Sequence, residues 1–332
     1  MAPSTTLNRP QGGVAPMTHD TFGPTSVAAG ETSAGFTELV VRLRAPLVVG
    51  YLAASTVVFA GFGSADRPAL LWWLVGLLAL TCAGSEAGPR RVAMDWLPLL
   101  IIAAGYDTVR AQAPDLLTRA VVTPQLRFDE IVFGGTAPTV SLQRWLDVTT
   151  GEIHWWDYVV WVGYLSHFVV SLSVAAYLYV VDSVRFKRFA TLILTVSVAG
   201  FVTYFIVPAA PPWLASQHGA LPHTTRIVDE VWAHLGLPGV AKVFNGSAQL
   251  ANPVAALPSL HAAWPLMVAL FLWPTARRGR YLLVLYVAFM AFVLVYGAEH
   301  YVSDVALGWL YTGVVLWGWN RYWARRETVS RS

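Results

Sequence analysis

Residues 256–273 read ALPSLHAAWPLMVALFLW, a short motif with a serine and a histidine followed by an almost unbroken apolar run. A helix rises about 1.5 Å per residue, so a helix of this length covers most of the hydrocarbon core of a bilayer. Pro258 is favoured in the first turn of a helix, and Ser259 can cap the turn or bind a phosphate through its hydroxyl. The stretch predicts a transmembrane helix whose positive dipole end, close to His261, favours an anion such as phosphate.

The overall composition excludes an ordinary soluble protein. Of the 332 residues, 56% are hydrophobic and 12% are charged, whereas about 25% charged residues are typical of soluble domains. Cys82 is the only cysteine, so the sequence holds neither a disulfide framework nor a thiolate metal site. We expect an all-α, polytopic membrane protein whose partners are the bilayer and its lipids, with no cofactor, no metal and no nucleic acid.

Seven more apolar runs accompany this one, and most are long enough to cross a bilayer. They lie at residues 46–62, 69–83, 92–106, 156–181, 189–208, 281–297 and 303–319. The sequence therefore predicts a transmembrane helix bundle of about eight spans. The second and third runs are short, and the third contains Asp95 and Pro98, so a re-entrant or tilted segment is the alternative for either.

These runs divide the chain into four parts. Residues 1–37 are rich in Pro, Gly, Ser, Thr and Ala and lack an apolar core, which is typical of a disordered tail. Residues 38–91 hold two accessory transmembrane helices, and residues 92–320 form a catalytic domain with a six-helix core. Residues 321–332 form a basic tail.

The distribution of basic residues predicts the orientation of the bundle. With eight spans, 15 of the 22 lysines and arginines fall on the side of the N-terminus. Cytoplasmic loops carry such an excess, so both termini are expected in the cytoplasm and residues 258–261 on the outer side. Only Lys187 and Lys242 are lysines, which favours a GC-rich bacterial genome and hence a bacterial plasma membrane.

A second polar motif follows His261 after 39 residues, where His300 and Asp304 lie four residues apart. If this segment is helical, both side chains share one face and come within reach of each other. A neutral imidazole can attack phosphorus when a carboxylate orients it and stabilises the cation that forms. We therefore expect His300 to be the nucleophile, Asp304 its partner, and His261 the general acid and base of a metal-independent phosphoryl transfer.

Several further residues are candidates for binding the substrate. Two long hydrophilic stretches, residues 107–155 and 209–255, are expected on the outer side and contribute basic side chains that can bind phosphate. These are Arg110, Arg119, Arg127, Arg144, Arg226 and Lys242. We select Arg127 and Arg110, together with Ser259 and Tyr296, as substrate-binding residues. His167, midway through a predicted span, either lines the lipid cavity or is a buried, hydrogen-bonded histidine.

The two histidine motifs resemble those of the type 2 phosphatidic acid phosphatase superfamily, in which Pro-Ser-Gly-His precedes Ser-Arg-x5-His-x3-Asp. Leu260 replaces the glycine, Leu294 stands in place of the arginine, and the superfamily's Lys-x6-Arg-Pro signature is absent from the sequence. With these departures, the two motifs resemble those of inositol phosphorylceramide synthase and its bacterial relatives. The segment 208–213 also resembles a segment of that branch. The resemblance covers about residues 92–320 and implies the same three catalytic residues.

Three functions agree with these observations. The first is a phosphotransferase that moves a phosphorylated head group, with phosphoinositol as one candidate, from a phospholipid to a lipid or sugar hydroxyl. The second is a phosphatase acting on a phosphatidate, sphingoid or polyprenyl phosphate, and the third is a non-enzymatic lipid transporter. The missing cationic signature favours the first, because a diester carries less charge than a monoester. A zinc site made by His261, His300 and Asp304 is a further alternative.

Overall fold

The computed structural model describes residues 89–148, 152–236 and 253–329, together with eight isolated positions between residues 43 and 80. The predicted tail 1–37, almost all of the two accessory spans and the last three residues of the basic tail lie outside the described residues. The division of the chain into four parts therefore stays a prediction.

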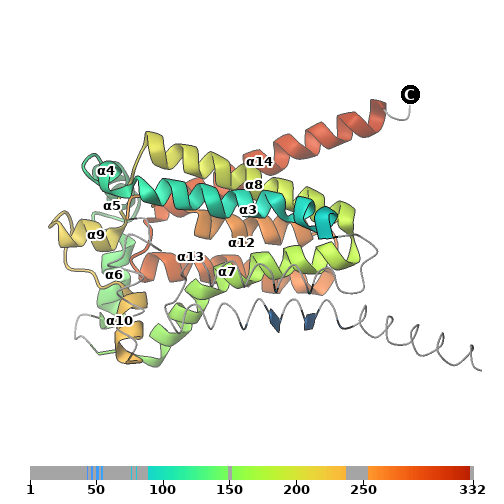
Figure 1. Cartoon of the computed structure of the whole chain (residues 1–332). Helices are drawn as coiled ribbons and strands as arrows, with labels where there is room; N and C mark the ends of the chain where they lie inside the picture. Colours follow the sequence, from blue (N-terminus) through green and yellow to red (C-terminus); the bar gives the residue numbers. More distant parts are fainter. Residues whose placement is uncertain are drawn as a thin grey trace, which may run out of the picture.

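Six long helices form the body of the described chain and run alongside one another (Figure 1). They are α3 (Pro89–Ala111), α7 (Trp155–Val181), α8 (Ser183–Ile206), α12 (Leu260–Leu272), α13 (Arg280–Tyr296) and α14 (Val302–Val329). Each coincides with one of the last six predicted apolar runs. The predicted all-α membrane bundle with a six-helix core is confirmed, because the apolar runs bury their backbone hydrogen bonds within helices.

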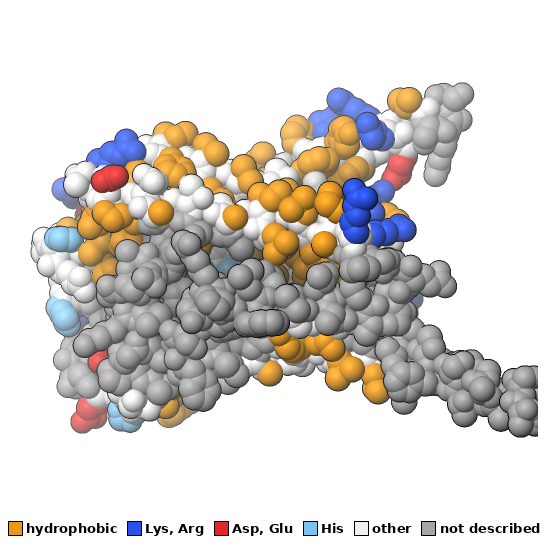
Figure 2. Space-filling view, viewed as in Figure 1, with side chains coloured by type: hydrophobic (Ala, Val, Ile, Leu, Met, Phe, Trp, Pro, Cys, Tyr) orange, Lys and Arg blue, Asp and Glu red, His pale blue; other side chains and the backbone are white. Residues whose placement is uncertain are grey.

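The helix α12 occupies a central position, since it packs against α7, α8, α13 and α14. By length and composition, three of the described helices can cross a membrane: Trp155–Val181, Ser183–Ile206 and Arg277–Tyr296. The predicted number of eight spans remains a prediction. Figure 2 shows hydrophobic side chains along the side of the bundle and a group of Lys and Arg side chains at its right-hand end. This pattern suits an apolar belt against lipid tails with basic residues beyond it.

Five short helices gather at the opposite end of the bundle (Figure 1). They are α4 (Ala113–Leu117), α5 (Thr123–Val132), α6 (Pro138–Trp145), α9 (Pro212–Gln217) and α10 (Ile227–His234). They belong to the two hydrophilic stretches of the sequence, and they meet the starts of α7 and α14 and the end of α13. Contacts of α10 with α7, of α6 with α13 and of α5 with α14 connect them to the long helices.

The two histidine motifs are held side by side at this end. The Ser259 N–H donates a hydrogen bond of 3.0 Å to the Asp304 carbonyl oxygen, which joins the start of α12 to the start of α14. Gly308 makes this approach possible, because a Cβ atom at that position would collide with the Ser259 carbonyl oxygen. Two isolated β-bridges, Val121 with Ala209 and Ala209 with Ala255, connect the neighbouring loops.

Candidate active site

The first motif lies at the N-terminus of α12. Ser259 is the N-cap, is fully buried, and its Oγ accepts a hydrogen bond of 3.2 Å from the Ala262 N–H. The predicted capping role of Ser259 is confirmed, whereas Pro258 precedes the cap and is not part of the first turn. His261 therefore projects from the first turn of the helix, beside N–H groups that have no partner within the helix.

The second motif is not one continuous helix, so the helical condition under which His300 and Asp304 would share a face is not met. His300 lies in the turn between α13 and α14, and α14 begins at Val302. Ala298 has a positive φ of 60°, and the N–H groups of Glu299 and His300 both donate to the Leu294 carbonyl at the end of α13. The chain therefore turns between α13 and α14, and His300 is not part of either helix.

The expected proximity of His300 and Asp304 is present in spite of this turn. His300 Nδ1 lies 3.6 Å from Asp304 Oδ2, and the same carboxylate oxygen accepts a hydrogen bond of 2.9 Å from the Tyr301 N–H. Asp304 is fully buried, and His300 is 5% exposed. The carboxylate is thus close enough to stabilise positive charge on the imidazole ring.

A backbone carbonyl makes the shorter contact with the His300 ring. His300 Nδ1 is 2.9 Å from the Ala256 carbonyl oxygen, whereas the Asp304 carboxylate is 3.6 Å away. A carbonyl oxygen only accepts hydrogen bonds, so Nδ1 carries the proton and Nε2 keeps its lone pair. Ala256 is itself held by a backbone bond from its N–H to the Ala209 carbonyl. Sequence reasoning missed this orienting group because a backbone carbonyl has no signature in the sequence.

The two motif histidines lie close together, and His300 is buried whereas His261 is partly exposed. The ring centroids of His261 and His300 are 5.7 Å apart, with the rings inclined at 49°. Tyr164 of α7 stacks on the His261 ring, with centroids 5.0 Å apart and an angle of 19°. A phosphorus atom bound between the two imidazoles would be within reach of both.

The structure also brings His167 to this site. Its ring centroid is 4.3 Å from that of His261 and 5.0 Å from that of Trp264, and the residue is 5% exposed. The sequence allows two interpretations of His167, a residue lining the lipid cavity or a buried histidine. The structure shows a buried histidine whose ring contacts a motif histidine.

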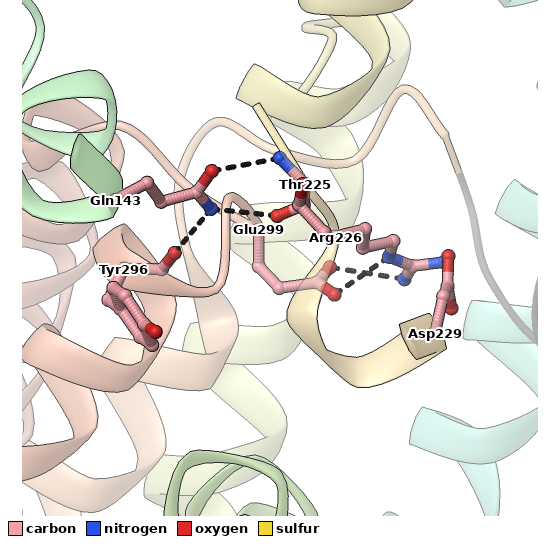
Figure 3. A network of polar contacts seen from close by, with 6 residues as sticks. All are labelled: Gln143, Thr225, Arg226, Asp229, Tyr296 and Glu299. Carbon is pink, nitrogen blue, oxygen red and sulfur yellow. Dashed lines mark hydrogen bonds and ion pairs between the residues drawn. The ribbon is translucent and has the colours of Figure 1, made fainter. Parts of the chain in front are cut away.

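A buried ion pair adjoins His300 on the other side. Arg226 donates from Nε and Nη2 to the two carboxylate oxygens of Glu299, at 2.8 and 3.1 Å, and from Nη1 to Asp229 at 3.4 Å (Figure 3). Its Cζ atom lies 4.9 Å from the centroid of the Trp213 ring. Burial by itself lowers the pKa of Arg226, and the charges of Glu299 and Asp229 more than offset this, so the pKa is raised and the guanidinium stays charged.

This ion pair fixes the turn that carries His300. Glu299 directly precedes His300, and the Trp213 N–H donates to the Ala298 carbonyl at 3.1 Å. Gln143 of α6 adds a third anchor, since its side chain bonds both backbone groups of Thr225 and the Tyr296 carbonyl (Figure 3). Three separate segments thus hold the turn in place. Glu299 was not recognised in the sequence, although its position beside His300 was a usable signal.

The structure separates the predicted substrate-binding residues. Tyr296 is fully buried, and its hydroxyl donates to Asp157 Oδ1 at 2.6 Å. The side chain of Arg127 is 70% exposed and pairs with Glu130 at 3.3 Å on α5. The Arg110 side chain lies outside the described residues. Substrate binding by these three residues remains a prediction.

Asp129, and not its neighbour Arg127, connects α5 to the second motif. Its carboxylate accepts hydrogen bonds from the N–H groups of Val302 at 2.9 Å and Ser303 at 3.1 Å, and so caps α14. Burial raises the pKa of Asp129, although these two hydrogen bonds oppose the shift. Within the described part of the chain, no group of three or more His, Cys, Asp or Glu side chains could hold a metal ion.

The fold and the paired histidines define the class of protein: a helical membrane enzyme that acts on lipids. The pattern of the PAP2 superfamily matches residues 136–318, and the chain belongs to this superfamily.

Two relatives indicate the branch. The chain is 29% identical over 242 residues to the phosphoinositol dihydroceramide synthase of Bacteroides thetaiotaomicron. The matched region covers 69% of this chain and 76% of the relative. It is also 28% identical over 181 residues to the inositol phosphorylceramide synthase catalytic subunit aur1 of Schizosaccharomyces pombe. This matched region covers 51% of this chain and 40% of the relative. No solved structure matches the chain. The resemblance to the inositol phosphorylceramide synthase branch is confirmed, and it supports a lipid phosphotransferase.

Proposed function

We propose that this enzyme transfers a phosphorylated head group from a phospholipid donor to a hydroxyl of a lipid or sugar acceptor, through a phosphohistidine formed on His300. Phosphoinositol is the first candidate for the head group, because both relatives are named as synthases of phosphoinositol-containing ceramides. The observation that carries the proposal is the pair of imidazoles with ring centroids 5.7 Å apart, with the Nδ1 proton of His300 held by a carbonyl.

In the first half-reaction, the Nε2 lone pair of His300 attacks phosphorus. The bond between phosphorus and the glycerol oxygen of the donor breaks, and the imidazolium of His261 gives its proton to that oxygen. Diacylglycerol leaves, and a phosphohistidine remains. The Ala256 carbonyl and the Asp304 carboxylate face the positive charge that develops on the His300 ring.

In the second half-reaction, the acceptor hydroxyl attacks the phosphohistidine. Neutral His261 takes the hydroxyl proton, the bond between phosphorus and nitrogen breaks, and His300 is regenerated. The phosphodiester product then leaves, with His261 again protonated. One histidine thus serves as acid and then as base, and no proton is gained or lost over the cycle.

The charge of the site favours transfer of a diester over hydrolysis of a monoester. Among the described residues, Arg226 is the one buried Lys or Arg side chain, and it is bound to Glu299 and Asp229. A phosphodiester carries a single negative charge and needs fewer cations than a terminal monoester. A lipid phosphatase is the second candidate, because it shares the first half-reaction and differs only in using water as the acceptor.

Purified enzyme in vesicles containing phosphatidylinositol and a ceramide acceptor tests the proposal. We expect diacylglycerol to be released in equal amount with an inositol-phosphate-bearing product, as measured by mass spectrometry. Lipid extracts from cells with and without the gene provide the second measurement. Accumulation of a lipid monophosphate in cells lacking the gene, without loss of a phosphodiester lipid, would establish the phosphatase instead.

We also propose that the active site faces the extracytoplasmic side of a bacterial plasma membrane. Both motifs and the short helices lie at one end of the bundle, and the basic loops of the sequence belong to the other end. The positive-inside rule places that basic end in the cytoplasm.

A further inference from the structure

A third histidine, His167, contacts the site from α7. It projects from the middle of a 27-residue apolar helix and is 5% exposed. A polar ring at such a position costs free energy of desolvation, and ionisable residues within membrane helices are usually functional. The mechanism above assigns it no task.

The position of His167 is defined by its contacts with His261. The ring centroids are 4.3 Å apart, with the rings inclined at 40°. Tyr164, one turn earlier on the same helix, stacks on the His261 ring, and Trp264 lies 5.0 Å from His167 on the other side. The α7 helix and Trp264 thus hold both imidazoles within one packed group of rings.

Other ionisable groups face this pair from the neighbouring elements. His300 lies 5.7 Å from His261 in the turn after α13, and Asp304 lies behind His300 at the start of α14. Arg226, before α10, interacts electrostatically with His261, and the Tyr204 hydroxyl of α8 donates to the Pro258 carbonyl. Among these groups, His167 is the one whose ring lies nearest to the His261 ring, with centroids 4.3 Å apart.

Two imidazoles in contact within an apolar environment behave as one titrating unit. A proton on one ring repels a second proton on the other, so the pair holds at most one proton. In the proposed mechanism, His261 first gives a proton to an alkoxide and later takes one from a hydroxyl. A partner imidazole favours both steps, because it stabilises the protonated and the neutral form of His261.

We propose that His167 is a positioning residue that orients His261 and shares with it the proton exchanged in both half-reactions. This inference rests on the proposed function. In the first half-reaction the shared proton passes through His261 to the departing glycerol oxygen, and the pair becomes neutral. In the second, the proton of the acceptor hydroxyl returns to His261 and is shared again, so the proton balance closes.

The substitution His167→Phe tests the proposal, because it keeps an aromatic ring against His261 and Trp264 but removes both nitrogens. With a natural lipid donor, we expect kcat to fall by about tenfold or more, a part of the contribution of general acid and base catalysis. KM should stay within about twofold, since donor binding is unchanged. His167→Gln, which keeps a hydrogen-bonding side chain, should lose less activity than His167→Phe.

A donor with a good leaving group separates proton sharing from a structural role. A nitrophenyl phosphodiester needs no acid to depart, so it should load His300 in His167→Phe at the wild-type rate. The loaded enzyme should then transfer to the acceptor slowly, because His261 is a poorer base. His218→Phe, which replaces an exposed histidine outside the site, is the control and should behave as wild type.

The outcomes distinguish failure of this inference from failure of the proposed function. If wild-type enzyme forms no phosphohistidine with the nitrophenyl donor, the proposed function is wrong. If His167→Phe retains wild-type kcat with the lipid donor, or loses both reactions equally, His167 only supports packing and the inference is overturned.

Discussion

At the scale of single residues, the surroundings of His300 and His261 differ in a way that suits the different roles proposed for them. The Nδ1 proton of His300 is held by the Ala256 carbonyl at 2.9 Å, with Asp304 at 3.6 Å, which leaves Nε2 to attack. His261 lies at the start of α12, where the rings of Tyr164 and His167 pack against its own ring.

This difference predicts distinct defects for the two histidines. His300→Ala should abolish both diacylglycerol release and labelling of the protein by donor phosphorus, because no nucleophile remains. His261→Ala should still load His300 from a nitrophenyl donor and should accumulate the adduct, since no base activates the acceptor. Detection of acid-labile label on the protein in a gel would measure the loading of His300 in both variants.

Asp304→Asn is expected to give a partial loss of activity, for comparison with the two histidine variants. It keeps the shape of the side chain but removes the charge beside the His300 ring, and we expect a loss of about 10² to 10⁴ in rate. Labelling in His300→Ala together with none in His261→Ala would exchange the two assignments.

At the scale of secondary-structure elements, the close approach of α12 and α14 unites the two motifs. The Ser259 N–H bonds the Asp304 carbonyl, and Gly308 leaves room for the Ser259 backbone one turn further along α14. Asp129 caps the start of the same helix from α5. The distance between His261 and His300 therefore depends on how closely these two helices pack.

Gly308→Ala should push the two helices apart at the site. The added methyl group meets the Ser259 carbonyl, and overpacking of this kind destabilises a protein by about 1–3 kcal/mol. We expect a lower unfolding temperature in detergent and a slower loading of His300.

Gly313→Ala is the matched control on the same helix. A Cβ atom there would meet no neighbouring atom within 4 Å, so this variant should be as stable as wild type or more stable. Equal effects of the two substitutions would show that the contact between Gly308 and Ser259 does not limit the packing of α12 against α14.

At the scale of the whole molecule, the orientation in the membrane decides which leaflet supplies the donor. After replacement of Cys82, single cysteines at Ser183, Thr275 and Ser330 should be protected from an impermeant thiol reagent in intact cells. A cysteine at Ala220, exposed among the short helices, should be labelled and serves as the positive control. Labelling of all three protected positions from outside would reverse the proposed orientation.

The charged and polar groups of the site predict that the enzyme is active without divalent metal ions. We expect the N-terminus of α12 and the imidazoles to supply the electrostatic stabilisation of the phosphoryl group. Activity in vesicles should therefore persist in EDTA, and vanadate should inhibit by adopting a five-coordinate geometry on His300. Loss of activity in EDTA that zinc restores would instead support a metal site.

The sequence by itself determined the helical membrane architecture of this protein and its two histidine motifs. An apolar run in a bilayer must satisfy its backbone hydrogen bonds internally, so each of the last six predicted runs lies in a helix, although α8 begins earlier and α14 ends later than the runs predicted. His261, His300 and Asp304 were recognisable because their residue types and spacing suit phosphoryl transfer. The helical spacing assumed for His300 and Asp304 was wrong, yet the turn brings them together all the same.

Only the tertiary structure decided what surrounds these residues. Ala256 contacts a histidine 44 residues away, Arg226 pairs with a carboxylate 73 residues away, and His167 meets His261 from another helix. Arg127, which the sequence favoured as a phosphate ligand, is largely exposed, whereas Arg226 is buried beside the His300 turn. Partners of this kind have no local signature, because the packing of helices far apart in the sequence brings them together.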